Sequence, residues 1–223
     1  MKKELDWKGV GQFLAFLLSL FAVIRDTLKK MNAGIEIVPW LTNDGKEFFV
    51  ETLTQLGDKF IKTQRIKVLS DVVIMVNLDV APRLPFDGAA VEKNEGGGWV
   101  KVEKRKDGLY IDGRKVVLYL SERQKNGQTI KGYELREEVS GKLVLHPNIL
   151  DALLEHSHLI PEDWKKDENG NTRYILFWAV IFRDSGGRLC VRSLHWDGGK
   201  WDWICGWLSH GFSSGGPAAV CAS

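Results

Sequence analysis

The sequence predicts an α+β protein in which helices come first and a mostly antiparallel set of strands follows. Before Lys67, apolar residues recur at helical spacing; after it, short apolar segments alternate with Asp-Gly and Asn-Gly turns. The 223 residues are 44% hydrophobic and 27% charged, which is typical of a globular protein. The net charge of +2 creates no field that favours a nucleic acid or a membrane surface, so neither partner is expected.

Residues 1–66 are predicted to form a helical segment that packs on the body of the protein. Residues 9–24 are an uncharged run of 16 residues, shorter than the roughly 20 residues of a membrane span. Acidic residues precede this run and no small-residue cleavage site follows it. A buried helix is therefore favoured over a signal peptide or an anchor, and a cytoplasmic location over surface display. Thr42-Asn43-Asp44 is typical of the cap of a second helix.

Residues 67–223 are predicted to form one α+β domain. Five strands are expected first, at residues 72–78, 99–102, 109–111, 116–120 and 130–135. The last two are expected to pair as a long hairpin across Asn126-Gly127. The basic segment 101–106 is interpreted as a solvated sheet edge.

A helix and a strand pair are expected in the second half of this domain. His146-Pro147-Asn148 predicts the start of a helix that ends near Pro161. Residues 173–182 and 189–194 predict two strands joined by the turn at 184–187. The outline is therefore helices first, then an antiparallel body with one inserted helix.

The histidines and cysteines form no recognisable site. The histidines near the inserted helix are His146, His156 and His158. No cysteine lies close to them in the sequence, so capping or solvent-facing roles are favoured over metal ligation. The cysteines are Cys190, Cys205 and Cys221. Their odd number, and the absence of a CxxC pair, predict reduced thiols, no metal and no cofactor.

Tryptophan is the unusual residue of this chain. Five of the nine tryptophans lie in the last 46 residues, and the only charged side chain from residue 201 onward is that of Asp202. The large residues here resemble a fixed framework: Trp196, Trp201, Trp203, Trp207 and Phe212. The residues between them share no size, polarity or periodicity. We call them the free positions: Asp197, Asp202, Ile204, Cys205, Gly206, Ser209, His210, Gly211, Ser213, Ser214, Gly215 and Gly216.

This tail resembles the variable region of target proteins that are diversified by diversity-generating retroelements. The resemblance extends to the closing Pro-Ala-Ala-Val at 217–220 and, upstream, to residues 159–165 and 177–192. In such systems an AAC template codon becomes an NNC codon, which cannot encode Lys, Glu, Gln, Met or Trp. The free positions obey this exclusion; for the eleven from residue 202 onward, simple composition gives a chance agreement of about one in twenty.

The resemblance implies a C-type-lectin-like domain whose variable region, residues 195–216, is presented on one surface. It also implies a non-enzymatic binding protein whose ligand is a protein or a surface structure. Of the free positions, Asp202, Ile204 and His210 are expected to contribute most to binding. Typical members end in a Gly-Phe-Arg strand, which this chain lacks, so the path of the final residues is left open.

Two other functions stay open at this stage. A carbohydrate-binding module would stack sugar rings on exposed tryptophans. An oxidase similar to the formylglycine-generating enzymes would need Cys190 or Cys205 as a redox thiol, and the sequence shows no suitably paired second cysteine.

Overall fold

The computed structural model describes residues 26, 30 and 64–222. The chain divides into two compact units, Met1–Lys59 and Phe60–Ser223. The helices predicted within residues 1–66, and their packing on the body, lie outside the described residues. In the part of the chain that is described, no helix is long and apolar enough to cross a membrane.

Residues 64–222 contain twelve strands and two α-helices. The strands are β1 (Ile66–Ser70), β2 (Val73–Asn77), β3 (Ala90–Asn94), β4 (Trp99–Arg105), β5 (Gly108–Ile111), β6 (Arg114–Tyr119), β7 (Ile130–Lys131), β8 (Tyr174–Arg183), β9 (Leu189–Asp197), β10 (Lys200–Trp207), β11 (Gly211–Phe212) and β12 (Ala218–Cys221). The helices are α4 (Gly132–Glu138) and α5 (Pro147–Glu155), with 3-10 turns η1 (Glu122–Gln124), η2 (Ser157–Leu159) and η3 (Glu162–Trp164). The predicted α+β class is confirmed.

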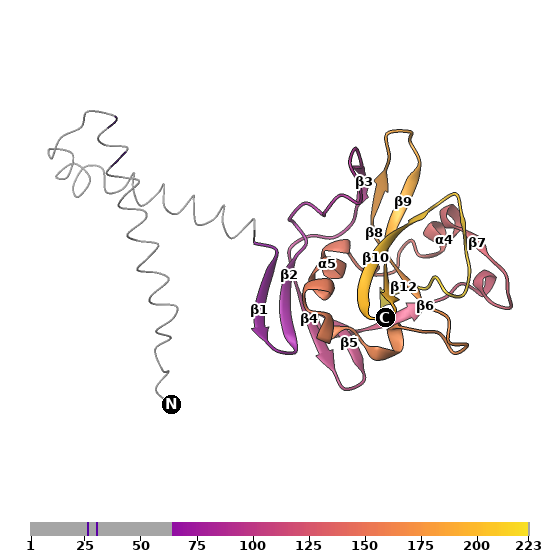
Figure 1. Ribbon diagram of the computed structural model, residues 1–223, viewed down its shortest axis with the longest axis horizontal. Coiled ribbons are helices and arrows are strands. Elements are labelled where there is room, and N and C mark those ends of the chain that lie inside the picture. Colours follow the sequence, from indigo (N-terminus) through magenta and orange to yellow (C-terminus); the bar gives the residue numbers. More distant parts are fainter. Residues whose placement is uncertain (1–25, 27–29, 31–63, 223) are drawn as a thin grey trace. The chain divides into compact units, whose positions relative to one another are not determined.

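Ten strands form one sheet in the order β1-β2-β4-β5-β6-β12-β8-β9-β10, with β3 paired to β8 (Figure 1). All neighbours are antiparallel except β12 and β8, which run parallel where Ala218 faces Leu176. The path of the chain end is thereby established: β12 lies between β6 and β8, where Ala218 and Ala219 are fully buried. Strands β7 and β11 form a separate small ladder.

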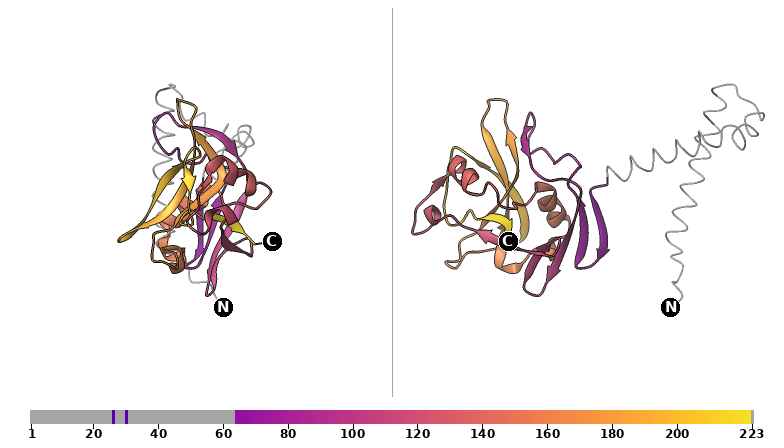
Figure 2. Two further views of the ribbon diagram at one scale, coloured as in Figure 1. Left: turned by 90° about the vertical axis from the view of Figure 1, so that its right-hand side faces the viewer. Right: turned by 180° about the vertical axis from the view of Figure 1, so that it is seen from behind.

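Helix α5 fills the space between the two ends of the sheet. In Figure 1 it lies between the strands β1, β2 and β4 and the strands β8 and β10. Its buried face includes Ile149, Leu150 and Leu153, which belong to the largest core cluster. Helix α4 lies at the opposite end of this unit from the β1–β2 hairpin (Figure 2), beside a second core cluster that contains Leu135 and Val139.

Most local predictions in the described part are confirmed. Strands occur close to 72–78, 99–102, 109–111, 116–120, 173–182 and 189–194. The inserted helix begins at Pro147 as expected, but α5 ends at Glu155 and is followed by the short turn η2.

Two predictions are wrong. Residues 130–135 do not pair with 116–120: β6 pairs with β5 and β12, while β7 is only two residues long and leads into α4. Residues 132–138 are helical instead, and the i, i+4 spacing of Leu135 and Val139 lets both side chains pack in one core cluster. Segment 101–106 is not a sheet edge either, because β4 lies between β2 and β5.

Candidate functional site

Successive side chains of β10 point to opposite faces of the sheet. This alternation places the tryptophans of the strand on one face and most of its free positions on the other. Strand β10 pairs with β9 from Lys200 to Trp207 without a bulge. Trp201 and Trp203 pack against the core that contains α5, and Trp207 packs against a smaller cluster on the same face of the strand. Asp202, Ile204 and Gly206 point to the opposite face, whereas the free position Cys205 lies on the face of the tryptophans and packs in the same cluster as Trp207. The spacing of residues 201, 203 and 207 in the sequence is that of one face of a strand.

Three framework tryptophans near the β9–β10 turn contact a ring or a cation. Trp196 and Trp201 face each other across the strands with ring centroids 5.4 Å apart, and Lys165 Nζ lies 3.9 Å from the centroid of Trp196. The guanidinium of Arg192 lies 4.3 Å from the ring centroid of Trp203. Such contacts add stabilisation beyond burial alone, so these rings are held in place without any contribution from the free positions.

The remaining framework aromatics are held in the same way. Trp207 lies between Phe86, at 5.8 Å between centroids, and the guanidinium of Arg188, at 4.6 Å. Phe212 makes an edge contact with the buried Trp178, with centroids 6.2 Å apart. All five framework residues are therefore partly buried and in contact with rings or cations.

Most free positions gather in one concavity on the face of β8, β9 and β10 opposite to α5. We call it the C-terminal pocket; its volume is about 460 Å³. Eight of the twelve free positions line it: Ile204, Cys205, Gly206, Gly211, Ser213, Ser214, Gly215 and Gly216. The other lining residues are Asp167, Asn171, Thr172, Tyr174, Leu176, Ser193 and Phe212. The free positions outside the pocket are Asp197, Asp202, Ser209 and His210.

The three free positions expected to contribute most to binding differ in availability. Ile204 is 48% exposed at the pocket, and His210 is exposed outside it. The Asp202 carboxylate is already paired with Lys200 Nζ at 2.8 Å, and this hydrogen bond lowers the pKa of Asp202. Asp202 is therefore engaged within its own strand.

The first residues of α4 hold the segment after β10 by its main chain. The backbone N–H groups of Tyr133 and Gly132 donate hydrogen bonds to the carbonyls of residues 208 and 210, at 3.3 and 3.1 Å. Lys131 Nζ donates to the carbonyl of residue 209 at 3.0 Å. The contact is close: a Cβ on Gly132 would lie 2.6 Å from Cα of Leu208.

Gln124 holds the next loop in a similar way. Its buried Nε2 donates to the carbonyls of Ser213 and Gly216, both at 2.9 Å, while its Oε1 accepts from the N–H of Ser121 at 3.0 Å. The N–H groups of Tyr174 and Leu176 donate to the carbonyls of residues 215 and 217. Because every acceptor is a main-chain carbonyl, these bonds do not depend on the side chains at residues 209–216. Sequence reasoning missed Gln124, since its partners lie 89 and 92 residues away.

The polar side chains at the free positions after β10 are not used by the fold. Within residues 64–222, the hydroxyls of Ser209, Ser213 and Ser214 and the ring of His210 make no hydrogen bond. All four residues are exposed. They are available to a ligand or to replacement.

Gly206 and Gly211 differ from the other glycines among the free positions, because a Cβ on either would lie closer than 3.0 Å to a neighbouring side chain. A Cβ on Gly206 would lie 2.7 Å from Cε1 of Phe212, whereas a Cβ on Gly215 would meet nothing closer than 3.5 Å. Any side chain at residue 206 thus requires the packed ring of Phe212 to move.

We expect Gly206→Ala to lower the free energy of unfolding by about 1–3 kcal/mol, because it overpacks the contact with Phe212. Gly215→Ala is the matched control: it should leave the stability unchanged or raise it by up to about 1 kcal/mol, through a less flexible unfolded chain. Urea denaturation of the two variants measures the difference. Equal stabilities would contradict this account of the Phe212 contact.

Two thiols lie together behind the pocket. Cys190 of β9 and Cys205 of β10 are offset by two residues in the strand register and share the cluster that contains Phe182. The hydrogen bond from Cys190, with the nearby charge of Arg192, lowers the pKa of Cys205. The same hydrogen bond and burial raise the pKa of Cys190. The sequence analysis found no paired cysteine, because only the register of β9 and β10 brings these two together.

We expect iodoacetamide to alkylate Cys205 at least about tenfold faster than Cys190 or Cys221, because a lowered pKa increases the thiolate fraction and Cys205 is only partly buried. Burial raises the pKa of Cys221, which serves as an internal reference. Mass spectrometry of peptides from a time course gives the three rates. Cys190→Ala should slow the labelling of Cys205 by removing the hydrogen bond; labelling of Cys221 as fast as Cys205 would refute the assignment.

The histidines do not form a metal site in the described part of the chain, where no group of three or more potential ligands comes together. His146 instead caps α5: its Nδ1 accepts the N–H of Asn148 at 3.1 Å. The predicted capping role of His146 is confirmed.

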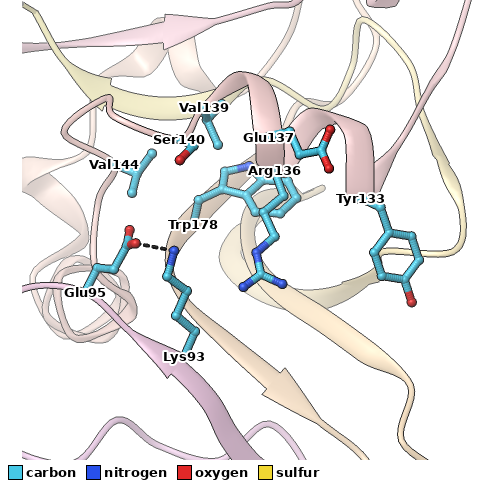
Figure 3. Close-up of a pocket in the computed structure, with 9 residues that line it drawn as sticks. All are labelled: Lys93, Glu95, Tyr133, Arg136, Glu137, Val139, Ser140, Val144 and Trp178. Atoms are coloured by element: carbon cyan, nitrogen blue, oxygen red, sulfur yellow. Dashed lines mark ion pairs between the residues drawn. The ribbon is translucent and has the colours of Figure 1, made fainter.

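A second concavity, of about 450 Å³, lies beside α4 (Figure 3) and is lined by no free position. Figure 3 shows an ion pair of Lys93 and Glu95 at its rim and the ring of Trp178 in its floor. The same ring contacts Phe212 of the C-terminal pocket. The free positions therefore single out the C-terminal pocket as the candidate site.

Comparison of the chain with protein-family models, curated proteins and solved structures gives no match.

Proposed function

We propose that this is a non-enzymatic ligand-binding protein whose C-terminal surface is diversified by a retroelement to recognise variable protein or surface ligands. The observation that carries the proposal is the placement of the free positions: eight of twelve line one pocket, while the tryptophans between them point to the core. In the packed core, a change of even one methylene affects stability. A surface that tolerates many residue types must therefore lie outside the core.

The way in which the segment is held also supports this proposal. Its loops are anchored through main-chain carbonyls by Gln124, Lys131 and α4, and its aromatic residues by rings and cations. Rigid aromatic side chains supply contact area at low conformational cost. Replacement of exposed free positions therefore leaves these anchors in place.

We further propose that the domain is C-type-lectin-like, as the resemblance of the tail implies. The α+β composition of residues 64–222 and the mainly antiparallel sheet are compatible with this assignment.

The genomic test of the proposal reads the codons at the free positions and the DNA beside the gene. We expect codons that end in C, a neighbouring template repeat with AAC at the same places, and a reverse transcriptase gene. Deep sequencing of the gene from a culture should show substitutions at the free positions and none at the framework. Mixed third bases without a repeat would overturn the proposal.

A matched pair of libraries tests the structural part. One library carries NNC codons at five exposed free positions: Ile204, Ser209, His210, Ser213 and Ser214. The control library carries NNC codons at the five framework residues. We expect most members of the first library, and few of the second, to resist proteolysis as folded proteins; similar fractions would contradict the division into framework and free positions.

The two alternatives make different demands on the same residues. Stacking of a sugar on Trp203 is limited because Arg192 covers one face of the ring. The oxidase alternative is favoured by the paired thiols of Cys190 and Cys205. Ligand binding that survives alkylation of Cys205 would speak against the oxidase, and binding to a glycan array that is lost in folded Trp203→Ala would favour the sugar.

A further inference from the structure

The C-terminal pocket contains one acidic side chain, whose oxygens already accept hydrogen bonds. Of the residues that line it, all within the described chain, Asp167 alone carries an acidic or basic side chain. Its carboxylate accepts the N–H groups of Asn169 and Asn171 at 2.9 and 2.8 Å and the side-chain amide of Asn171 at 3.1 Å. These bonds lower the pKa of Asp167, so the carboxylate stays ionised while neutral donors occupy its oxygens. An anionic ligand group would lose its hydration here without gaining an ion pair, and a cationic group would have to share a carboxylate that already accepts three hydrogen bonds.

The walls of the pocket are mostly apolar, and two of the side chains that form them are well exposed. Leu176 and Phe212 lie in the lining, together with Ile204, which is 48% exposed, and Tyr174, which is 43% exposed. Exposed apolar surface in a concavity marks a binding site. The volume of about 460 Å³ lies within the range of pockets that enclose small molecules or side chains.

Two rings in the lining are held before any ligand arrives. Tyr174 stacks on His195 with centroids 5.2 Å apart, and Phe212 makes an edge contact with Trp178. Rings that are already fixed lose little conformational entropy on binding and can contact a further ring by offset stacking or edge-on. Nearby, Gly215 and Gly216 present main chain without side chains, and a Cβ on either would meet nothing closer than 3.4 Å.

We propose that the C-terminal pocket receives an uncharged aromatic side chain, phenylalanine or tyrosine, that projects from a protein ligand. This inference rests on the proposed function and specifies the chemistry that the present set of free residues recognises. Buried aromatic anchors account for much of the energy of protein interfaces, and a mainly apolar pocket whose one carboxylate already accepts three hydrogen bonds favours such anchors over lysine, arginine or acidic side chains.

The test uses the ¹⁵N-labelled full-length chain and small probes. N-acetyl-tyrosinamide and N-acetyl-phenylalaninamide should shift the amide resonances of Gly206, Gly211 and Gly215 saturably, with dissociation constants on the order of 1 mM, a weak affinity that suits isolated side chains. N-acetyl-lysinamide, N-acetyl-phosphotyrosinamide and methyl glucoside should cause no saturable shift. Equal or stronger responses to a charged probe or to the sugar would overturn the inference.

A matched pair of variants tests whether the aromatic probes bind in the C-terminal pocket. Ile204→Asp places a charge at the apolar wall and should weaken binding of the aromatic probes at least about tenfold. Val68→Asp adds the same charge at an exposed apolar residue of β1, at the other end of the sheet from β10 and outside the free positions, and should leave their affinity unchanged. The inference fails if both variants behave alike, or if no aromatic probe binds the wild-type chain. Codons that end in C at the free positions, with a template repeat that carries AAC at the same places, would leave the proposed function standing in either case.

Discussion

Replacement of Arg192 by leucine should lower the free energy of unfolding by about 3–5 kcal/mol, the usual cost of removing one partner from a buried ion pair. Arg192 is 1% exposed, and its Nη2 lies 2.7 Å from Oδ1 of Asp151 on α5. After the replacement, Asp151 would keep only Arg83 as an ion-pair partner within residues 64–222, with Nε 3.9 Å from Oδ2. The guanidinium also contacts Trp203, so the loss affects the strand that presents the free positions.

Urea denaturation measures this effect, with Arg123→Leu as the matched control. Arg123 pairs with Glu134 at 2.7 Å, but both side chains are about half exposed, and such pairs contribute about 1 kcal/mol or less. The double variant Arg192→Leu/Asp151→Leu should be more stable than Arg192→Leu, because it leaves no unpaired buried charge. Similar losses for Arg192→Leu and Arg123→Leu would refute the assigned role of the buried pair.

Stability should fall by about 3 kcal/mol between pH 6.5 and pH 4 through His146 alone. Burial of this 1% exposed ring lowers its pKa to about 4, against 6.5 in an unfolded chain. The unfolded state therefore binds a proton in this interval that the folded state does not. The contribution of the neutral ring is fully present above pH 6.5 and is lost as the pH falls toward 4. The geometry requires the neutral form, since Nδ1 accepts the N–H of Asn148 while Nε2 lies 3.0 Å from Oδ1 of Asn94.

His146→Asn isolates this contribution, because asparagine is a good helix cap that does not titrate. Free energies of unfolding at pH 7, 5.5 and 4 should decline less steeply for the variant than for the wild type. Carboxylates with lowered pKa, such as those of Asp167 and Asp184, titrate in both proteins. Their contributions therefore cancel when the free energy of unfolding of the variant is subtracted from that of the wild type at each pH. Parallel pH profiles would show that His146 does not carry this dependence.

Local features of the fold could be predicted from the sequence where neighbouring residues specify them. Asp112 and Gly113 both have positive φ, 49° and 80°, as the predicted turn between β5 and β6 requires. The turn at Asn126-Gly127 is also present, with φ of 54° and 75°. Its two flanking segments nevertheless do not pair with each other, because β6 is already flanked by β5 and β12.

The candidate site was predicted in its composition but not in its architecture. The division into framework and free positions came from the residues alone, and the alternation of tryptophans in β10 explains it physically. The contacts that hold the site, from Gln124, Lys131 and α4, lie far away in the sequence and make no pattern within the tail.

The sequence by itself determined the turns, the cap of α5, the alternation of apolar residues and the unusual tail, because each depends on residues a few positions apart. Only the tertiary structure decided that β12 lies between β6 and β8, that Cys190 meets Cys205, and that eight free positions line one pocket. The physical reason is that strand pairing is chosen by the burial of whole faces across the sheet, and a strand does not encode its partner in its own residues.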